Sequence, residues 1–242
     1  MTERQDVHNS SVPALCFACE ARHRGVCGAL DSDQLVSLAR TSTKKTLRTG
    51  SELIGDAQSI EGYSNILSGV VKLTKCLPDG REQIVGLQFA PDFLGRPFQT
   101  ESAITAQAAT NVVLCSFPKR TVESLIAQSP KLEHRLLEQT LRELDEARSW
   151  MLTLGRKNAL EKVASYLLLI SSYINPPVQP TSQEIAFDLP MSRVEIADFL
   201  GLTIETVSRQ LTKLRVDGII EVSHNRHIVV AHPGRLRITS GD

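Results

Sequence analysis

Residues 44–117 show the pattern of a β-rich domain, because short apolar stretches alternate with turn residues and glycines recur every 5–11 positions. The clearest predicted hairpin joins residues 70–76 to residues 81–87 through residues 77–80, where Pro78-Asp79-Gly80 supplies the turn. A short helix is expected before this region, over residues 31–40, with Asp31 or Ser32 as its N-cap. Many short strands at this spacing predict a double-sheet jelly roll.

From residue 130 to residue 156 the pattern becomes helical, and the 27 residues would form a helix about 40 Å long. One seam recurs at alternating steps of four and three residues, at Leu137, Leu141, Leu144, Arg148 and Met151. A second stripe lies beside it, at Leu136, Thr140, Ala147, Trp150 and Leu154. Two stripes allow one helix to face its own domain and a partner helix at the same time. We therefore expect a dimerisation helix; the alternative is a core helix that packs only within its own chain.

The C-terminal part carries the signals of a helix-turn-helix. A helix over residues 159–173, a proline-rich loop at 175–180 and a short strand around 185–189 are expected to precede it. Ser192 and Glu195 are spaced as a capping box, and Gly201 allows the sharp turn after the first helix. Thr203 can cap the second helix, over residues 204–216. A hairpin over residues 219–222 and 227–230 would form the wing of a winged helix.

The two helices of this motif have predicted buried and exposed faces. The buried positions are Val194, Ile196, Ala197 and Leu200 on the first helix, and Ile204, Val207, Leu211 and Leu214 on the second. Glu205, Ser208 and Arg209 share the opposite face of the second helix near its N-terminus, where a recognition helix meets base edges. We expect these three residues to read bases, and Thr206, Lys213 and Arg215 to contact phosphates.

Charge and composition limit the partners of the chain and the cellular compartment in which it is expected. The 27 basic and 27 acidic residues balance, so any basic surface for nucleic acid must be local. The N-terminus lacks the apolar stretch of a signal peptide, and no apolar run is long enough to cross a bilayer. We therefore expect a soluble cytoplasmic protein that does not interact with membranes. In that compartment structural disulfides are not expected, and the clustered cysteines are expected to bind metal or do redox chemistry.

Three of the cysteines, Cys16, Cys19 and Cys27, have the spacing Cys-x2-Cys-x7-Cys, which lets one short loop present several thiolates to one metal centre. Cys115, at a predicted strand end, can supply a fourth thiolate, whereas Cys76 is expected to play no part. From the residues alone the loop could hold an iron–sulfur cluster, a zinc ion or no metal.

Other residues of this loop suit an anionic cluster. Gly25 and Gly28 would give the loop the freedom to wrap around a metal centre. Arg22, His23 and Arg24 would balance the negative charge of a cluster that carries four thiolates. Together these patterns predict an α+β chain with a cysteine loop at 1–30, whose first 12 residues are polar and expected to be disordered, and a jelly-roll sensor at 31–129. A dimerisation helix at 130–157 and a winged helix-turn-helix at 158–242 would follow.

The chain resembles the CRP-like regulators, and specifically their FNR branch in its alphaproteobacterial FnrL/FnrN form, from about Cys16 to Val230. The resemblance lies in residues 16–27 (CFACEARHRGVC), 91–97 (PDFLGRP), 143–152 (ELDEARSWML) and 201–209 (GLTIETVSR). The last stretch contains the Glu-x-x-Ser-Arg pattern of this branch.

This resemblance implies a cyclic-nucleotide-binding-like jelly roll, a long dimer helix and a winged helix. It also implies a [4Fe–4S] cluster on Cys16, Cys19, Cys27 and Cys115, and binding of the homodimer to palindromic double-stranded DNA of the form TTGAT-N4-ATCAA. RNA polymerase is an expected partner, through the surface around residues 90–99. The stretch from Phe93 to Thr105 lacks the pattern of the family's cyclic-AMP site, so no cyclic nucleotide is expected.

The resulting hypothesis is an oxygen-responsive transcription regulator in which an intact cluster favours pairing and DNA binding. One alternative is a regulator of the same fold without a cluster, using zinc or thiol redox chemistry. A second alternative, from a different class, is a thiol oxidoreductase that uses Cys16 and Cys19. The enzyme hypothesis is weak, because the pair lacks the βαβ setting of thioredoxin-like proteins and no other catalytic constellation is evident in the sequence.

Overall fold

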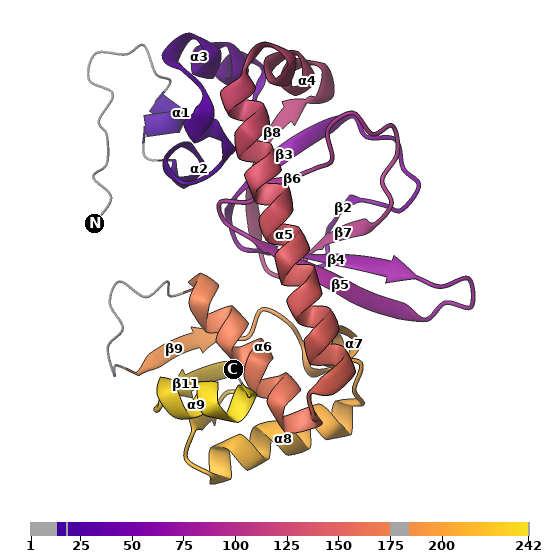
Figure 1. The fold of residues 1–242 in the computed structure, drawn as a ribbon, viewed down its shortest axis with the longest axis vertical. Coiled ribbons are helices and arrows are strands. Elements are labelled where there is room, and N and C mark those ends of the chain that lie inside the picture. Colours follow the sequence, from indigo (N-terminus) through magenta and orange to yellow (C-terminus); the bar gives the residue numbers. More distant parts are fainter. Residues whose placement is uncertain (1–13, 18, 175–183, 242) are drawn as a thin grey trace. The chain divides into compact units, whose positions relative to one another are not determined.

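The computed structural model describes residues 14–17, 19–174 and 184–241 (Figure 1). The predictions of a disordered segment at 1–12 and of a loop at 175–180 fall outside these residues. The chain divides into two compact units, each described by itself below. The first comprises Met1–Lys75 and Gly86–Leu144, and the second comprises Cys76–Val85 and Asp145–Asp242.

Two four-stranded antiparallel sheets form the predicted jelly roll. One sheet has the order β1-β8-β3-β6 and the other the order β2-β7-β4-β5. The strands of the first sheet are β1 (Thr43–Leu47), β8 (Val112–Pro118), β3 (Gly62–Ser68) and β6 (Phe93–Leu94). Those of the second are β2 (Glu52–Ile54), β7 (Thr105–Ala108), β4 (Val70–Cys76) and β5 (Glu82–Phe89). Buried Ile66, Val71 and Leu114 belong to a core contributed by both sheets.

Short helices surround the N-terminal end of this unit. The expected cysteine loop consists of helical turns, α1 (Ala14–Phe17), α2 (Glu20–His23) and η1 (Val26–Ala29). Helix α3 (Ser32–Thr41) begins as predicted, since Asp31 accepts a hydrogen bond from the Gln34 backbone in a capping box. Helix α4 (Lys119–Gln128) was missed, although Val122, Leu125 and Ile126 have helical spacing and are buried. These helices cover a second apolar core that includes Val26, Leu30 and Leu132.

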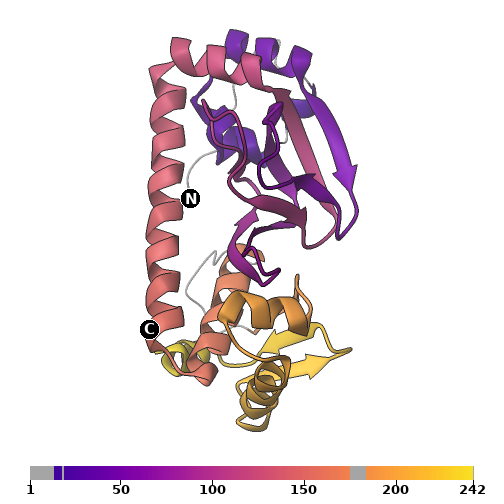
Figure 2. The same ribbon diagram turned by 90° about the vertical axis from the view of Figure 1, so that its right-hand side faces the viewer.

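The predicted long helix is α5 (Pro130–Arg156), which runs unbroken (Figure 2). Its predicted seam is solvent-exposed in the single chain. The predicted second stripe is partly wrong, because Thr140 and Ala147 are exposed. The buried positions are instead Leu132, Gln139 and Thr153. A polar side chain can occupy such a position when it is hydrogen-bonded, as Gln139 is to both backbone groups of Phe93.

The second unit is the predicted winged helix. After α6 (Ala159–Ile174) it contains α7 (Arg193–Leu200) and α8 (Ile204–Val216), and it ends with α9 (Pro233–Ser240), which was not predicted. Its sheet has the order β10-β11-β9, formed by Ile220–Ser223, His227–Val230 and Ile185–Asp188. None of the helices in the described part of the chain combines the length and apolar character needed to cross a bilayer.

Two predicted core positions of this unit are wrong. Val194 is 50% exposed and Ile204 is 41% exposed. Phe199 takes the core role on α7, where its ring contacts Trp150 edge-on with the centroids 4.5 Å apart. Aromatic side chains bury more area than Val or Ile, so this contact determines which face of α7 points inward.

Two glycine-to-alanine substitutions in this unit should have opposite effects on stability. Gly201 ends α7 with φ +60°, a backbone conformation that costs a residue with a Cβ about 1–2 kcal/mol, so Gly201→Ala should lower the free energy of unfolding. Gly234 lies in α9 at an ordinary φ with open space around it, so Gly234→Ala should raise that free energy by up to about 1 kcal/mol. Urea denaturation of the full chain followed by circular dichroism measures both. Changes of the same sign would contradict the assigned backbone geometry.

Candidate metal centre and nucleic-acid interface

Four thiols from distant parts of the chain line one cavity of about 60 Å³. Cys16 lies on α1, Cys19 is the N-cap of α2 and Cys27 lies in η1. Cys115 comes from strand β8, in the sheet. The structure thus brings together all four residues expected to be ligands, whereas exposed Cys76 does not line the cavity.

The segment formed by α1, α2 and η1, which carries Cys16, Cys19 and Cys27, is called the cysteine segment below. It reaches the sheet through tight backbone packing. A Cβ at Gly25 would lie 2.8 Å from the carbonyl oxygen of Pro91, and one at Gly28 would lie 2.7 Å from that of Arg22. These glycines are therefore required for close approach rather than for the flexibility expected from sequence. Val26 and Leu30 anchor the segment in the apolar core that also contains Leu132 of α5.

Residues around the fourth thiol come from neighbouring strands. Lys44 on β1 and Asn65 on β3 pair directly with Cys115 in the strand register, and both line the cavity. The amide Nδ2 of Asn65, which is 1% exposed, donates a hydrogen bond to Cys27 Sγ at 3.0 Å. Its Oδ1 atom is buried and has no hydrogen-bond partner among the residues that the structure describes. Sequence reasoning missed Lys44 and Asn65, because the relevant signal is pairing between strands distant in sequence.

The thiols influence one another's ionisation. Burial raises the pKa of Cys27 to about 12; the hydrogen bond from Asn65 opposes this, and the nearby thiols Cys19, Cys115 and Cys16 add to it. Burial also raises the pKa of Cys16, which Arg22 counteracts. Burial likewise raises the pKa of Cys115, against a hydrogen bond from Ser42 and the charge of Lys44. Burial therefore disfavours the thiolate form of Cys16, Cys27 and Cys115, and a positively charged group such as a metal would favour it.

The spacing of the thiols bears on the kind of metal group that fits. Thiolates on one zinc ion lie about 3.8 Å apart, because Zn–S bonds of about 2.3 Å point to the corners of a tetrahedron. Within the described residues, no three His, Cys, Asp or Glu side chains lie close enough together to hold a metal ion as they stand in this structure. The thiolates of a four-iron cluster bind separate iron atoms and lie further apart. Of the three predicted cations of the loop, Arg22 lines the cavity, whereas His23 and Arg24 do not.

The predicted base-reading residues lie together on α8. Glu205, Ser208 and Arg209 are all exposed in its first two turns. Thr203 caps the helix by accepting a hydrogen bond from the Thr206 backbone, and its hydroxyl hydrogen-bonds the Thr206 hydroxyl. The Arg209 guanidinium donates to that same Thr206 hydroxyl at 3.3 Å, which holds the arginine over the first turn.

Hydrogen bonds at the N-terminal end of α8 favour the ionised form of the Glu205 carboxyl group. Hydrogen bonds from its own backbone N–H and from Thr203 hold the pKa of Glu205 below its usual range. The side chain is therefore an acceptor at neutral pH. Two of the predicted phosphate contacts, Lys213 and Arg215, are exposed further along α8, and Thr206 is partly exposed.

Helix α7 and the wing hold α8 in place. Ser192 and Glu195 form the predicted capping box, and Gly201 adopts the left-handed conformation that turns the chain into α8. Val207, Leu211 and Leu214 bury the inner face of α8. Arg193 of α7 donates to the Asn225 carbonyl in the turn of the wing at 3.0 Å, tying the wing to the helix pair.

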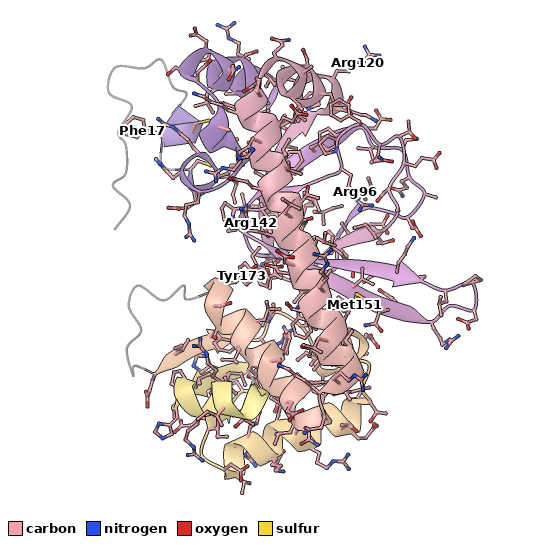
Figure 3. The ribbon with its side chains drawn as sticks, in the orientation of Figure 1. Phe17, Arg96, Arg120, Arg142, Met151 and Tyr173 are labelled. Atoms are coloured by element: carbon pink, nitrogen blue, oxygen red, sulfur yellow. The ribbon has the colours of Figure 1, made fainter. Side chains whose placement is uncertain are left out.

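The predicted dimer seam of α5 carries large exposed apolar side chains. Leu137 is 54% exposed, Leu141 50%, Leu144 44% and Met151, labelled in Figure 3, 73%. Arg148 interrupts the seam and pairs with Asp145 of its own helix at 3.3 Å. Exposed leucines in one line are unusual for an isolated surface and typical of an interface.

Comparisons with known proteins agree with this architecture. A family model described as a cyclic nucleotide-binding domain matches residues 44–129, and one described as a Crp-like helix-turn-helix domain matches residues 161–238. A probable transcriptional activator of Rhizobium leguminosarum bv. viciae is 52% identical, covering 94% of this chain and 93% of the relative. The transcriptional activator protein FnrL of Cereibacter sphaeroides is 39% identical over 94% and 92%. Among solved structures, FixK2 from Bradyrhizobium japonicum matches with a TM-score of 0.72 and 31% identity, over 82% of this chain and 96% of that one.

Proposed function

Because the chain belongs to the CRP/FNR family of DNA-binding transcription regulators, we propose that it is an oxygen-responsive activator whose DNA binding depends on a [4Fe–4S] cluster. The observation that carries this proposal is the single cavity lined by Cys16, Cys19, Cys27 and Cys115. Relatives named as transcriptional activators, FnrL among them, support it. All the relatives named here are regulators, so the thiol oxidoreductase hypothesis has no further support.

The residues of the cavity fit this group. Four soft thiolate donors, cationic Arg22 and Lys44, and the buried amide of Asn65 suit an anionic iron–sulfur centre. When bound, the cluster supplies an oxygen-labile link between the cysteine segment and β8. A regulator of the same fold without a cluster is the remaining alternative, and an anaerobic assay of iron and acid-labile sulfide separates the two.

The chain's own contacts connect the cysteine segment to the dimer helix. Gly25 packs against Pro91, two residues before Phe93. Phe93 donates its backbone N–H to Gln139 Oε1 at 3.2 Å, and its carbonyl accepts from Gln139 Nε2 at 2.9 Å. Val26 and Leu132 also share one core. Release of the segment would therefore remove packing that positions α5.

Pairing of α5 with its copy in a second chain creates the DNA-binding form. The leucines of the seam, which are exposed in the single chain, would be buried against the partner helix in such a homodimer. A two-fold dimer holds two recognition helices about one DNA turn apart, which matches a palindromic site of the TTGAT-N4-ATCAA type. A single chain makes half of these contacts, so loss of pairing collapses the affinity for DNA.

On the DNA, each α8 reads one half-site. Ionised Glu205 accepts from a cytosine N4 group, Arg209 pairs with guanine, and Ser208 contacts either partner. Thr206, Lys213 and Arg215 contact phosphates, so binding weakens as the salt concentration rises. The protein then acts where DNA is located, in the cytoplasm.

Two further features belong to the proposal. RNA polymerase is the proposed partner of residues 90–99, where Phe98 is 63% exposed. No cyclic nucleotide is required in this proposal, since the stretch from Phe93 to Thr105 lacks the pattern of the family's cyclic-AMP site.

Substitution of one thiol should test the ligand set. Cys115→Ser should abolish the visible absorption and bound iron of an anaerobically purified sample, because a fourth thiolate is lost. Cys76→Ser removes an exposed thiol outside the cavity and should leave both unchanged. Equal effects of the two variants would refute the assignment.

Base reading by Glu205 can be tested by selection of binding sites from random DNA. Glu205→Ala should relax the preference at the G·C pair of each half-site, with a loss of about 1–3 kcal/mol of discrimination. Glu82→Ala makes the same charge change at an exposed position of β5 and should keep the preference. An unaltered preference in Glu205→Ala would count against direct readout.

The dimer seam can be broken by a single charge. Leu144→Glu places a carboxylate in the seam of each helix and should give a monomer by sedimentation velocity, with a matching loss of DNA binding. Ser149→Glu adds the same charge at an exposed position of α5 outside the seam and should remain dimeric. A dimer that persists in Leu144→Glu would move the interface elsewhere.

A further inference from the structure

One buried amide joins the cysteine segment to the sheet at the thiol cavity. Asn65 lies on β3 and is 1% exposed, and it lines the cavity together with Cys27 and Cys115. Its Nδ2 atom donates a hydrogen bond to Cys27 Sγ at 3.0 Å, and the residue lies opposite Cys115 in the register of β3 and β8. A single side chain therefore links a thiol of the segment to the place where the sheet presents its own thiol.

The cluster-free fold gains little stability from this side chain. Burial of Asn65 leaves its Oδ1 atom without a hydrogen-bond partner among the described residues, and an unpaired buried amide oxygen costs free energy. A neutral thiol is a weak acceptor, so the hydrogen bond to Cys27 offsets only part of this cost. Leucine has nearly the same shape and no polar atom to desolvate. A buried polar group that remains partly unsatisfied calls for an explanation at the site that it lines.

We propose that Asn65 is a positioning residue that holds Cys27 as a ligand of the cluster and slows the loss of iron. This role rests on the function proposed above. A hydrogen bond is stronger when its acceptor is ionised, so the Asn65 amide binds a ligating thiolate more tightly than a free thiol. Hydrogen bonds to metal ligands also orient those ligands and strengthen metal binding. Asn65 thus favours the loaded form at the expense of the stability of the cluster-free form.

Asn65→Leu separates these two effects. Under anaerobic conditions, the loaded variant should lose its iron to an excess of a strong chelator roughly tenfold faster than the unmodified protein, as followed by visible absorption. In urea denaturation, the cluster-free variant should be at least as stable as the unmodified protein, because a partly unsatisfied buried amide is removed. An unchanged rate of iron loss would overturn the role of Asn65. Faster loss with a less stable cluster-free fold would also overturn it, because that result describes a general packing defect.

Gln88 on β5 provides the matched control. It is a buried amide of the same unit that donates to Glu143 at 3.2 Å, and its Oε1 atom likewise has no hydrogen-bond partner among the described residues. It does not line the thiol cavity. Gln88→Met removes this amide with little change in shape and should lose iron at the rate of the unmodified protein. Equal acceleration in Gln88→Met and Asn65→Leu would overturn the role of Asn65.

NMR spectra of the cluster-free chain test the hydrogen bond itself. The pair of side-chain amide signals that disappears in Asn65→Leu belongs to Asn65. In Cys27→Ala these amide protons should shift and exchange faster with solvent, because their acceptor is lost. Cys76→Ala removes an exposed thiol outside the cavity and should leave them unchanged. Unchanged signals in Cys27→Ala would overturn the hydrogen bond and with it the role of Asn65.

The outcomes also separate this role from the proposed function. Loaded proteins that release iron equally with and without the Asn65 amide would overturn the role of Asn65 and leave the proposed function intact. A chain that contains no iron after anaerobic preparation would overturn both, and the NMR result would then still decide whether Asn65 holds Cys27.

Discussion

The organisation of the first unit depends on the contact of the cysteine segment with strands β3 and β8. A segment of about fifteen residues has too little apolar surface to fold alone, and its three helical turns are each too short to persist without support. It is held because Val26 and Leu30 enter a core shared with α5 and because the Asn65 amide bonds Cys27 beside Cys115. The thiols that would bind metal are thus gathered by packing around one buried amide, and the same packing contacts the dimer helix.

Local signals in the sequence were sufficient to predict α6, α7, α8 and the strands of the second unit, although not α9. The bounds of α8 follow from Thr203 as cap and Gly218 after its end, and those of α7 from Ser192, Glu195 and Gly201. The bounds of α5 were predicted correctly because its polar and apolar positions keep one period over its whole length. These features depend on residues within a few positions of one another, so a single sequence contains them.

Features that depend on tertiary pairing could not be predicted in the same way. The convergence of four cysteines was expected, but Lys44 and Asn65 were not, since they meet Cys115 only through the register of β1, β8 and β3. Val194 and Ile204 were expected in the core because they are apolar, whereas the ring of Phe199 packs there instead. Likewise, the inner face of α5 was expected to be apolar, and nothing local to Gln139 indicates that a backbone in the sheet would satisfy its amide.

The paired hydrogen bonds between Gln139 and Phe93 have a mechanical consequence. A contact made only of leucines tolerates sliding or rotation at small cost, because apolar packing has no fixed direction. An amide that is hydrogen-bonded to both backbone groups of one residue fits in a single axial register. A slip of α5 by one helical turn would leave three buried polar groups without these hydrogen bonds: the N–H and the carbonyl of Phe93, and the side-chain amide of Gln139. These two hydrogen bonds therefore fix the axial register of the first half of α5 on β6, so the strand could not shift along the helix without breaking them.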